Sequence, residues 1–100
     1  MSKKPRLSEK DELEVVKYIY YYQKVHGSSP SIREIRDHLH LKSHSAVQRR
    51  IQILIDMGYL DRRDGMSRGL QVKRKGVIAF REYERKIKKL MKYKEMEWQQ

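Results

Sequence analysis

The chain has 100 residues, of which 38% are hydrophobic and 37% charged, and it carries a net charge of +11 at pH 7. This size and composition predict one small, highly charged domain with a modest core, located in the cytoplasm. The chain has no cysteine, which excludes disulfides and thiolate metal sites, and no apolar run approaches the ~20 residues of a membrane span or the apolar stretch of a signal peptide.

Residues 1–7 form a basic tail, and the first predicted helix follows Ser8 and runs to about His26. Ser8 is a good N-cap with Asp11 at the capping-box spacing, and Gly27 is a residue that commonly ends a helix. The helix carries apolar residues on two nearly opposite sides, and we therefore expect it to pack on both. These are Val15, Val16, Ile19 and Tyr22 on one side and Tyr18, Tyr21 and Val25 on the other.

A helix-turn-helix pattern follows. Ser31 and Glu34 repeat the capping-box spacing at the start of a short second helix of about two turns. After the turn "HLKS", Ser43 is the predicted N-cap of a third helix, which ends at Gly58. Two short helices joined by a tight turn are typical of DNA-binding domains.

The chain then changes to a strand-like pattern. Tyr59–Arg63 and Leu70–Lys73 are predicted strands, and the loop "DGMSRG" between them carries two glycines, which favours a β-hairpin. A last helix is expected from Val77 to about Trp98. The predicted fold is thus mainly α with a small β-hairpin: a winged helix-turn-helix over residues 8–73 and an added basic, amphipathic C-terminal helix over residues 74–100.

Charge is unevenly distributed along the chain. Residues 62–94 hold thirteen Lys and Arg against three Asp and Glu, and residues 38–55 contain no acid. Such segregation favours a polyanionic partner, because neutralised phosphates release counterions. Solubility alone is the alternative explanation.

The third helix is the predicted DNA-reading element. One face of this helix is apolar and the opposite face is polar. The side chains near its N-terminus are small, and this is the end that enters a major groove first. Ala46 suits a thymine methyl group, Gln48 an adenine edge and Arg49 a guanine edge. A merely solvated face is the alternative. The candidates on this helix are Ser43, His44, Ser45, Ala46, Gln48, Arg49 and Gln52.

Further contacts are expected from the hairpin and from the start of the second helix. Arg68, beside Ser67 at the predicted tip, is long enough to reach a phosphate or a narrow minor groove, unless it is only a loop charge. Side chains alternate in direction along a strand, so either Arg62 or Arg63 would point toward DNA and the other away from it. Ser31 and Arg33 lie where free N–H groups favour a phosphate, although capping alone is an equal role for Ser31.

The last helix carries an apolar stripe that needs a partner. The run "YIYYY" on the first helix cannot form one platform for stacked bases, because neighbouring helical residues face different directions. We expect the last helix to pack on the second side of the first, within one chain or across a homodimer. A free basic helix lying along DNA or an acidic partner is the alternative. The residues concerned are Tyr18, Tyr21 and Val25, and Phe80, Tyr83, Ile87 and Leu90.

No catalytic or cofactor site is expected. His38, His40 and His44 lie on a helix end, a turn and the next helix start, without a cysteine, so zinc is not predicted. There is no nucleophile triad, no carboxylate pair in a glycine-rich pocket and no phosphate-cradling loop. So small a basic chain leaves little room for a closed active site, and we do not expect an enzyme.

Several stretches carry a resemblance to a known family. "GSSPSIREI" at residues 27–35, "GYL" at 58–60 and "SRGLQV" at 67–72 are similar to the N-terminal DNA-binding domain of LexA-type repressors. Further matching residues between them are Leu39, Leu41, Ser43, Val47 and Leu54. The resemblance covers roughly residues 8–73. It implies a three-helix winged domain whose third helix lies in the major groove and which binds a palindromic operator as a dimer.

The sequence also departs from that family. LexA-type repressors carry a downstream self-cleavage domain with a Ser-Lys pair and an Ala-Gly cleavage site, whereas this chain has no Ala-Gly dipeptide and continues as a charged helix. We therefore expect no self-proteolysis, and we expect any dimerisation to come from another surface. The base-reading positions, Ser45, Ala46, Gln48 and Arg49, differ from the best-known relatives, so the operator is expected to differ too.

The prediction is a sequence-specific binder of double-stranded DNA that acts as a transcriptional repressor. Two alternatives stay open. One is a nonspecific or architectural nucleic-acid binder, RNA included. The other is a winged-helix module that docks a polymerase or a replication factor.

Overall fold

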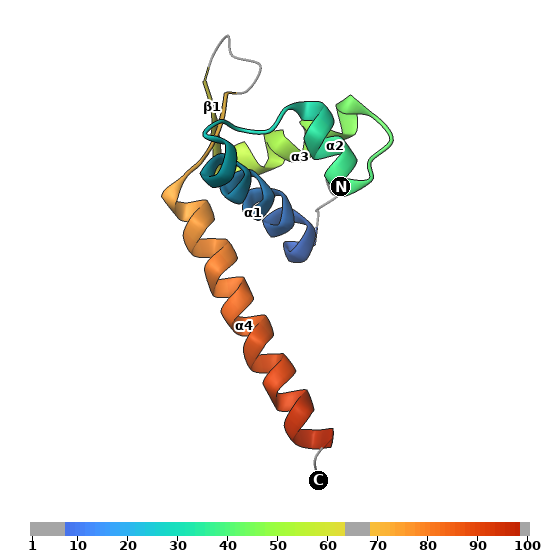
Figure 1. Ribbon diagram of the computed structural model, residues 1–100, viewed down its shortest axis with the longest axis vertical. Coiled ribbons are helices and arrows are strands. Elements are labelled where there is room, and N and C mark those ends of the chain that lie inside the picture. The colour runs from blue at the N-terminus through green and yellow to red at the C-terminus, as the bar shows by residue number, and fades with distance from the viewer. Residues whose placement is uncertain (1–7, 64–68, 99–100) are drawn as a thin grey trace, which may run out of the picture.

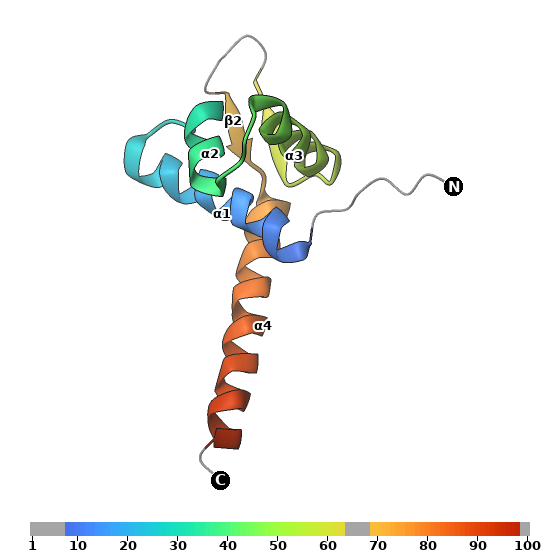
Figure 2. The same ribbon diagram turned by 90° about the vertical axis from the view of Figure 1, so that its right-hand side faces the viewer.

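The computed structural model describes residues 8–63 and 69–98 of the chain. In this part the order of elements is α1 (Glu9–His26), α2 (Ile32–Leu39), α3 (His44–Asp56), β1 (Leu60–Arg62), β2 (Leu70–Val72) and α4 (Arg74–Trp98). The first three helices and the hairpin form one body, and α4 projects away from it (Figures 1 and 2). This is the predicted winged helix-turn-helix with an added C-terminal helix.

The predicted helix starts are confirmed by their hydrogen bonds. The hydroxyl of Ser8 accepts from the Asp11 N–H at 3.2 Å. At α2 the capping box is complete: the Ser31 hydroxyl accepts from the Glu34 N–H at 3.1 Å, and the Ser31 N–H donates to the Glu34 carboxylate at 3.2 Å. Ser43 caps α3 through the N–H three residues on. Each cap satisfies a donor that the helix itself leaves without a partner.

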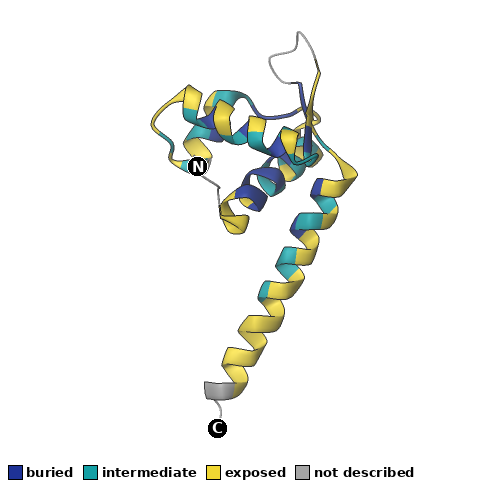
Figure 3. Cartoon of the chain, turned by 180° about the vertical axis from the view of Figure 1, so that it is seen from behind, coloured by how far each residue is buried: buried dark blue, intermediate teal, exposed yellow. Residues whose placement is uncertain are grey.

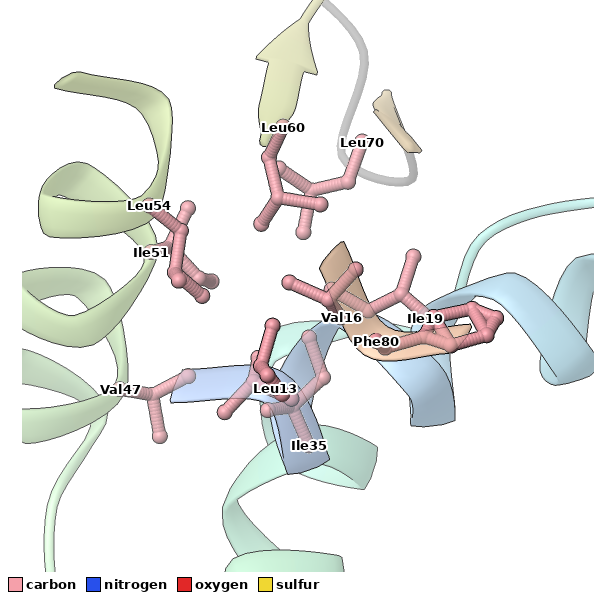
Figure 4. Close-up of a cluster of buried hydrophobic side chains, with 11 residues drawn as sticks. Leu13, Val16, Ile19, Ile35, Val47, Ile51, Leu54, Leu60, Leu70 and Phe80 are labelled. Atoms are coloured by element: carbon pink, nitrogen blue, oxygen red, sulfur yellow. The ribbon is translucent and has the colours of Figure 1, made fainter. Parts of the chain in front are cut away.

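The core lies where the body and the first turns of α4 meet. Figure 4 shows apolar side chains from all these elements pointing toward a common centre. Phe80 is one of them, with 1% of its surface exposed. The first turns of α4 are therefore part of the body's core. The full set is Leu13, Val15, Val16, Ile19, Ile35, Val47, Ile51, Leu54, Leu60, Leu70 and Phe80.

The hairpin is antiparallel and tied to α1. Leu60 pairs with Val72 and Arg62 with Leu70. The side-chain amide of Gln23 donates to the Leu70 carbonyl at 2.8 Å. This bond ties β2 to the C-terminal half of α1.

The start of α4 differs from the prediction. The helix begins at Arg74 rather than at Val77. The sequence "KRKG" reads as a break, but Gly76 lies inside the first turn, where an added Cβ would sit 2.6 Å from the Tyr59 carbonyl oxygen. Glycine is needed here because the helix packs directly on the main chain before β1, not because the helix is interrupted.

In the part of the chain that the structure describes, no helix combines the length and the apolar character that crossing a membrane requires.

Candidate nucleic-acid interface

The helix α3 has two distinct faces. Val47, Ile51 and Leu54 are fully buried against the core. On the opposite side Gln48 and Arg49 are exposed. The first turn contains no acidic residue, so nothing in it opposes a phosphate or an electronegative groove edge.

The N-terminal turn of α3 is tightly organised. The Ser43 hydroxyl accepts from the Ala46 N–H at 3.2 Å and lies 3.2 Å from the Ser45 hydroxyl. Ser43 is therefore occupied as a cap, while His44 and Ser45 are exposed and Ala46 is half-buried. The small side chains at this end allow a close approach of the helix axis to a groove.

Gln52 has a partner that sequence reasoning missed. Its side-chain amide donates to the Asp56 carboxylate at 2.9 Å. The four-residue spacing along one helix face is a local signal that could have indicated this bond. Among the predicted base contacts, Gln52 would have to exchange or share this hydrogen bond, whereas Gln48 has no side-chain hydrogen bond to any of the residues that the structure describes.

The predicted contacts outside α3 occupy two places. Arg33 is exposed at the start of α2, next to Ser31, whose hydroxyl serves the capping box. Arg62 is exposed at the end of β1, and its backbone N–H, not its guanidinium group, donates to the Asp61 carboxylate at 2.8 Å. Ser67 and Arg68, the predicted tip residues, lie outside the described residues.

Two of the candidate contacts, Arg33 and Arg49, are exposed arginines. Among residues 8–63 and 69–98, no ion pair engages Arg33 or Arg49. An arginine without a carboxylate partner presents its full charge and its planar donors to a ligand, which is what recognition of phosphates or of a guanine edge needs.

The aromatic residues of α1 pack differently from the expected contact between two apolar stripes. Tyr18 stacks on His38 of α2, with ring centroids 3.9 Å apart, and its burial there raises the pKa of the phenol. Tyr21 does approach Phe80, at 6.0 Å between centroids. Val25 is 76% exposed and Leu90 54% exposed.

The reason is the path of α4. It crosses α1 near Tyr20 and Tyr21, as the ring contacts of Phe80 show, and then runs beside the N-terminal half of α1. Tyr83 and Ile87 therefore face residues such as Leu13, and not Tyr18 or Val25. The part of α4 beyond them leaves the body.

The described residues contain no group of three His, Cys, Asp or Glu side chains that could hold a metal ion. His38 instead lies 3.3 Å from the Glu14 carboxylate and stacks on Tyr18. Its contacts are those of a residue that joins α1 to α2.

Comparison with known proteins assigns the domain. Residues 6–69 match the family model of the LexA DNA binding domain. The chain belongs to this family. The matched LexA DNA-binding domain includes α1, α2, α3 and β1, and thus every candidate contact described above.

The similar proteins are named LexA repressors. The LexA repressor of Roseiflexus sp. (strain RS-1) is 37% identical over 60 residues, which is 60% of this chain and 28% of the relative. That of Petrotoga mobilis (strain DSM 10674 / SJ95) is 35% identical over 63 residues, 63% of this chain and 30% of the relative. That of Limosilactobacillus reuteri (strain DSM 20016) is 32% identical over 72 residues, 72% of this chain and 35% of the relative. The matched part spans about a third of the length of these relatives.

Proposed function

We propose that this chain is a transcriptional repressor that binds double-stranded DNA sequence-specifically, with α3 in the major groove. The observation that carries the proposal is the polar face of α3, where Gln48 and Arg49 are exposed beside a first turn without acids, in a member of the LexA DNA-binding domain family. The relatives are named LexA repressors, which supports repression as the output.

Each part of the interface has a distinct role in this proposal. Arg49 donates to a guanine edge and Gln48 pairs with an adenine edge, while Ala46 contacts a thymine methyl. Arg33 at the start of α2 and Arg62 on the hairpin bind phosphates and set the register of the protein on the duplex. A repressor of this kind acts by occupying its operator and excluding polymerase.

The test is selection of binding sites from a pool of random duplexes with the purified full chain, followed by footprinting of the enriched sequence. We expect one consensus site that binds about 10³-fold or more tightly than random duplex. Protection should centre on a major-groove face, and the enriched site should lose affinity when the bases within it are changed.

The basic charge of the chain favours one competing function, nonspecific nucleic-acid binding. The net charge of +11 is enough for sequence-independent binding that weakens steeply with salt. Both functions lose affinity with salt, so the deciding measurement is competition with excess random DNA or RNA. If random DNA or RNA displaces the protein from the selected site as effectively as the same molar excess of the selected site does, sequence-specific binding is refuted.

A further inference from the structure

The helix α4 carries a continuous row of basic side chains along one side. At about 100° per residue, six Lys and Arg between residues 74 and 92 fall within an arc of about 100° on the helix surface, and no acid falls within that arc. All six are exposed. Figure 3 shows exposed residues along the whole length of α4. We call this set the basic stripe, and it consists of Arg74, Arg81, Arg85, Lys88, Lys89 and Lys92.

The charges of the basic stripe are available to a ligand. Among the residues that the structure describes, no ion pair engages any member of the stripe, and Glu84 of α4 pairs with Lys17 of α1 instead. Arg81 donates to the Tyr20 hydroxyl at 3.4 Å and lies over the Tyr20 ring, 5.9 Å from its centroid, and both contacts leave its charge in place. A row of such cations produces a positive field that attracts a polyanion.

The basic stripe points away from the body. Phe80, which is 1% exposed, and the half-buried Tyr83 and Ile87 pack toward α1 from nearly the opposite side of α4. A helix that lies on a membrane inserts its apolar side between the lipids. Because this apolar side of α4 is already packed against the body, the basic stripe over residues 74–87 fits a polyanion in water better than a lipid surface.

The helix α1 separates the basic stripe from the helix-turn-helix. Tyr20 of α1 contacts Phe80 of α4, with ring centroids 5.4 Å apart. Tyr18, nearly opposite to Tyr20 on α1, stacks on His38 of α2. The ribbon views show α2 and α3 on one side of α1 and α4 on the other (Figures 1 and 2). The polar face of α3 and the basic stripe therefore point away from the body on different sides, and one straight duplex does not lie along both.

We propose that the basic stripe binds the phosphate backbone of a second DNA duplex, distinct from the one that α3 holds, so that one chain joins two segments of double-stranded DNA. This goes beyond the proposed function and rests on it only for the duplex at α3. Contacts to phosphates carry no base specificity, so the second duplex can have any sequence.

The length and uniform sign of the basic stripe favour a duplex over an acidic protein. The stripe rises about 27 Å along α4, from Arg74 to Lys92, and a duplex presents one negative charge about every 1.7 Å of its axis. From Arg81 onward the stripe has a cation in every helical turn. A phosphate backbone matches such a row along its whole length, whereas a typical protein surface intersperses both signs of charge.

Energy transfer between two labelled duplexes tests the proposal with the full chain. The donor duplex carries the selected site, and the acceptor duplex has an unrelated sequence. We expect energy transfer when the protein is added, because one chain holds both duplexes. Competition with unlabelled duplex, single-stranded RNA and phosphatidylserine vesicles then compares the possible polyanions. If RNA or vesicles displace the acceptor at a lower phosphate concentration than duplex does, the proposal is wrong.

A pair of substitutions identifies the surface that is responsible. Lys88→Gln combined with Lys92→Gln removes two charges from the basic stripe. We expect the affinity for the acceptor duplex to fall about tenfold and the exponent of its salt dependence to fall by about 1.8, since each neutralised phosphate contributes about 0.9. The affinity for the donor duplex should stay within about twofold, because exposed charges far from α3 are screened.

The matched control removes the same charge from other sides of the same helix. Lys86→Gln combined with Lys94→Gln changes two exposed lysines outside the basic stripe, at equal helix propensity. We expect the affinity for the acceptor duplex to stay within about twofold of the parent. An equal loss in the two double variants, or no loss in either, overturns the proposal.

The outcome for the donor duplex separates this proposal from sequence-specific reading by α3. If the stripe variant loses affinity for the donor duplex alone, the stripe lies on the DNA that α3 holds and the proposal is wrong. If selection enriches no site, the proposed function fails, but two unrelated duplexes can still be used for the energy-transfer measurement. The two failures are therefore distinguishable.

Discussion

Gly76 in the first turn of α4 packs directly on the main chain of Tyr59, so that a Cβ at residue 76 would lie 2.6 Å from the Tyr59 carbonyl oxygen. Gly76→Ala should therefore destabilise the protein, because the helix must move away from β1. We expect a loss of about 1–2 kcal/mol, since overpacking costs about 1–3 kcal/mol and alanine regains at most about 1 kcal/mol of helix propensity. Urea unfolding measures the difference. An equal or higher stability would show that the turn is free to shift.

Phe80 should be as important to the body as any residue of α1–α3. Phe80→Ala removes a side chain that is 1% exposed, and we expect a loss of about 3–5 kcal/mol in the free energy of unfolding. Ile78→Ala, on the same helix but with 47% of the residue exposed, should cost well under half as much. Equal costs at the two positions would mean that α4 does not dock as described.

Arg49 is expected to contribute specificity and not only affinity. Arg49→Ala should weaken binding to the selected site by about 1–3 kcal/mol, roughly 5- to 150-fold, and should relax the preference at one base pair. Arg85→Ala removes the same charge from an exposed position on α4 and should affect all duplexes alike and only weakly. Titration of both variants with the selected site and with single-base variants of it makes the comparison. A uniform loss for Arg49→Ala would indicate a phosphate contact instead.

The capping box of α2 offers a prediction about stability. Ser31→Ala removes the acceptor of the Glu34 N–H and should cost about 0.5–2 kcal/mol. Ser28→Ala, an exposed serine in the preceding loop, should change the stability by less than about 0.5 kcal/mol. Thermal and urea unfolding of the two variants distinguish the cap from a general effect of losing a hydroxyl. If Ser31 also binds a phosphate, Ser31→Ala will in addition weaken DNA binding by the same factor for every duplex sequence.

The ion pair between Lys17 and Glu84 joins α1 to α4 at 2.7 Å. The hydrogen bond to Glu84 raises the pKa of Lys17 above its usual value of 10.5, against the opposing effect of burial. Because the folded-state pKa is the higher one, the contribution to stability is complete below pH 10.5 and disappears as the pH rises through the folded-state value. Lys17→Met should thus be less stable than the parent near pH 7, by about 0.2–1 kcal/mol for so exposed a pair, and the difference should shrink at alkaline pH and with added salt. A difference that is independent of both would assign the effect to packing.

Sequence reasoning predicted the features that depend on neighbours along the chain. Ser8, Ser31 and Ser43 cap helices because a hydroxyl reaches an N–H three residues on, and no other part of the fold takes part. The apolar face of α3 follows in the same way from the helical repeat. These features were sufficient to predict the winged helix-turn-helix order and the candidate face of α3.

The features that it missed join segments distant in the sequence. Tyr18 meets His38 only because α1 and α2 cross at that level, and no local pattern distinguishes a tyrosine that stacks there from one that faces a groove. The last helix was predicted to begin at Val77 rather than at Arg74, because the contact of Gly76 with Tyr59 is not visible in the local sequence. The position of Phe80 in the core follows from the same docking of α4.

The cap at Ser43 and the anchoring of α3 by Val47, Ile51 and Leu54 give the helix its shape before any ligand arrives. A duplex that docks on it meets a rigid template, so little ordering entropy remains to be lost on the protein side. In the function proposed above, mismatched sequences would then be rejected by the arrangement of a few side chains on α3 and by the cost of deforming the duplex, rather than by incomplete folding of the protein.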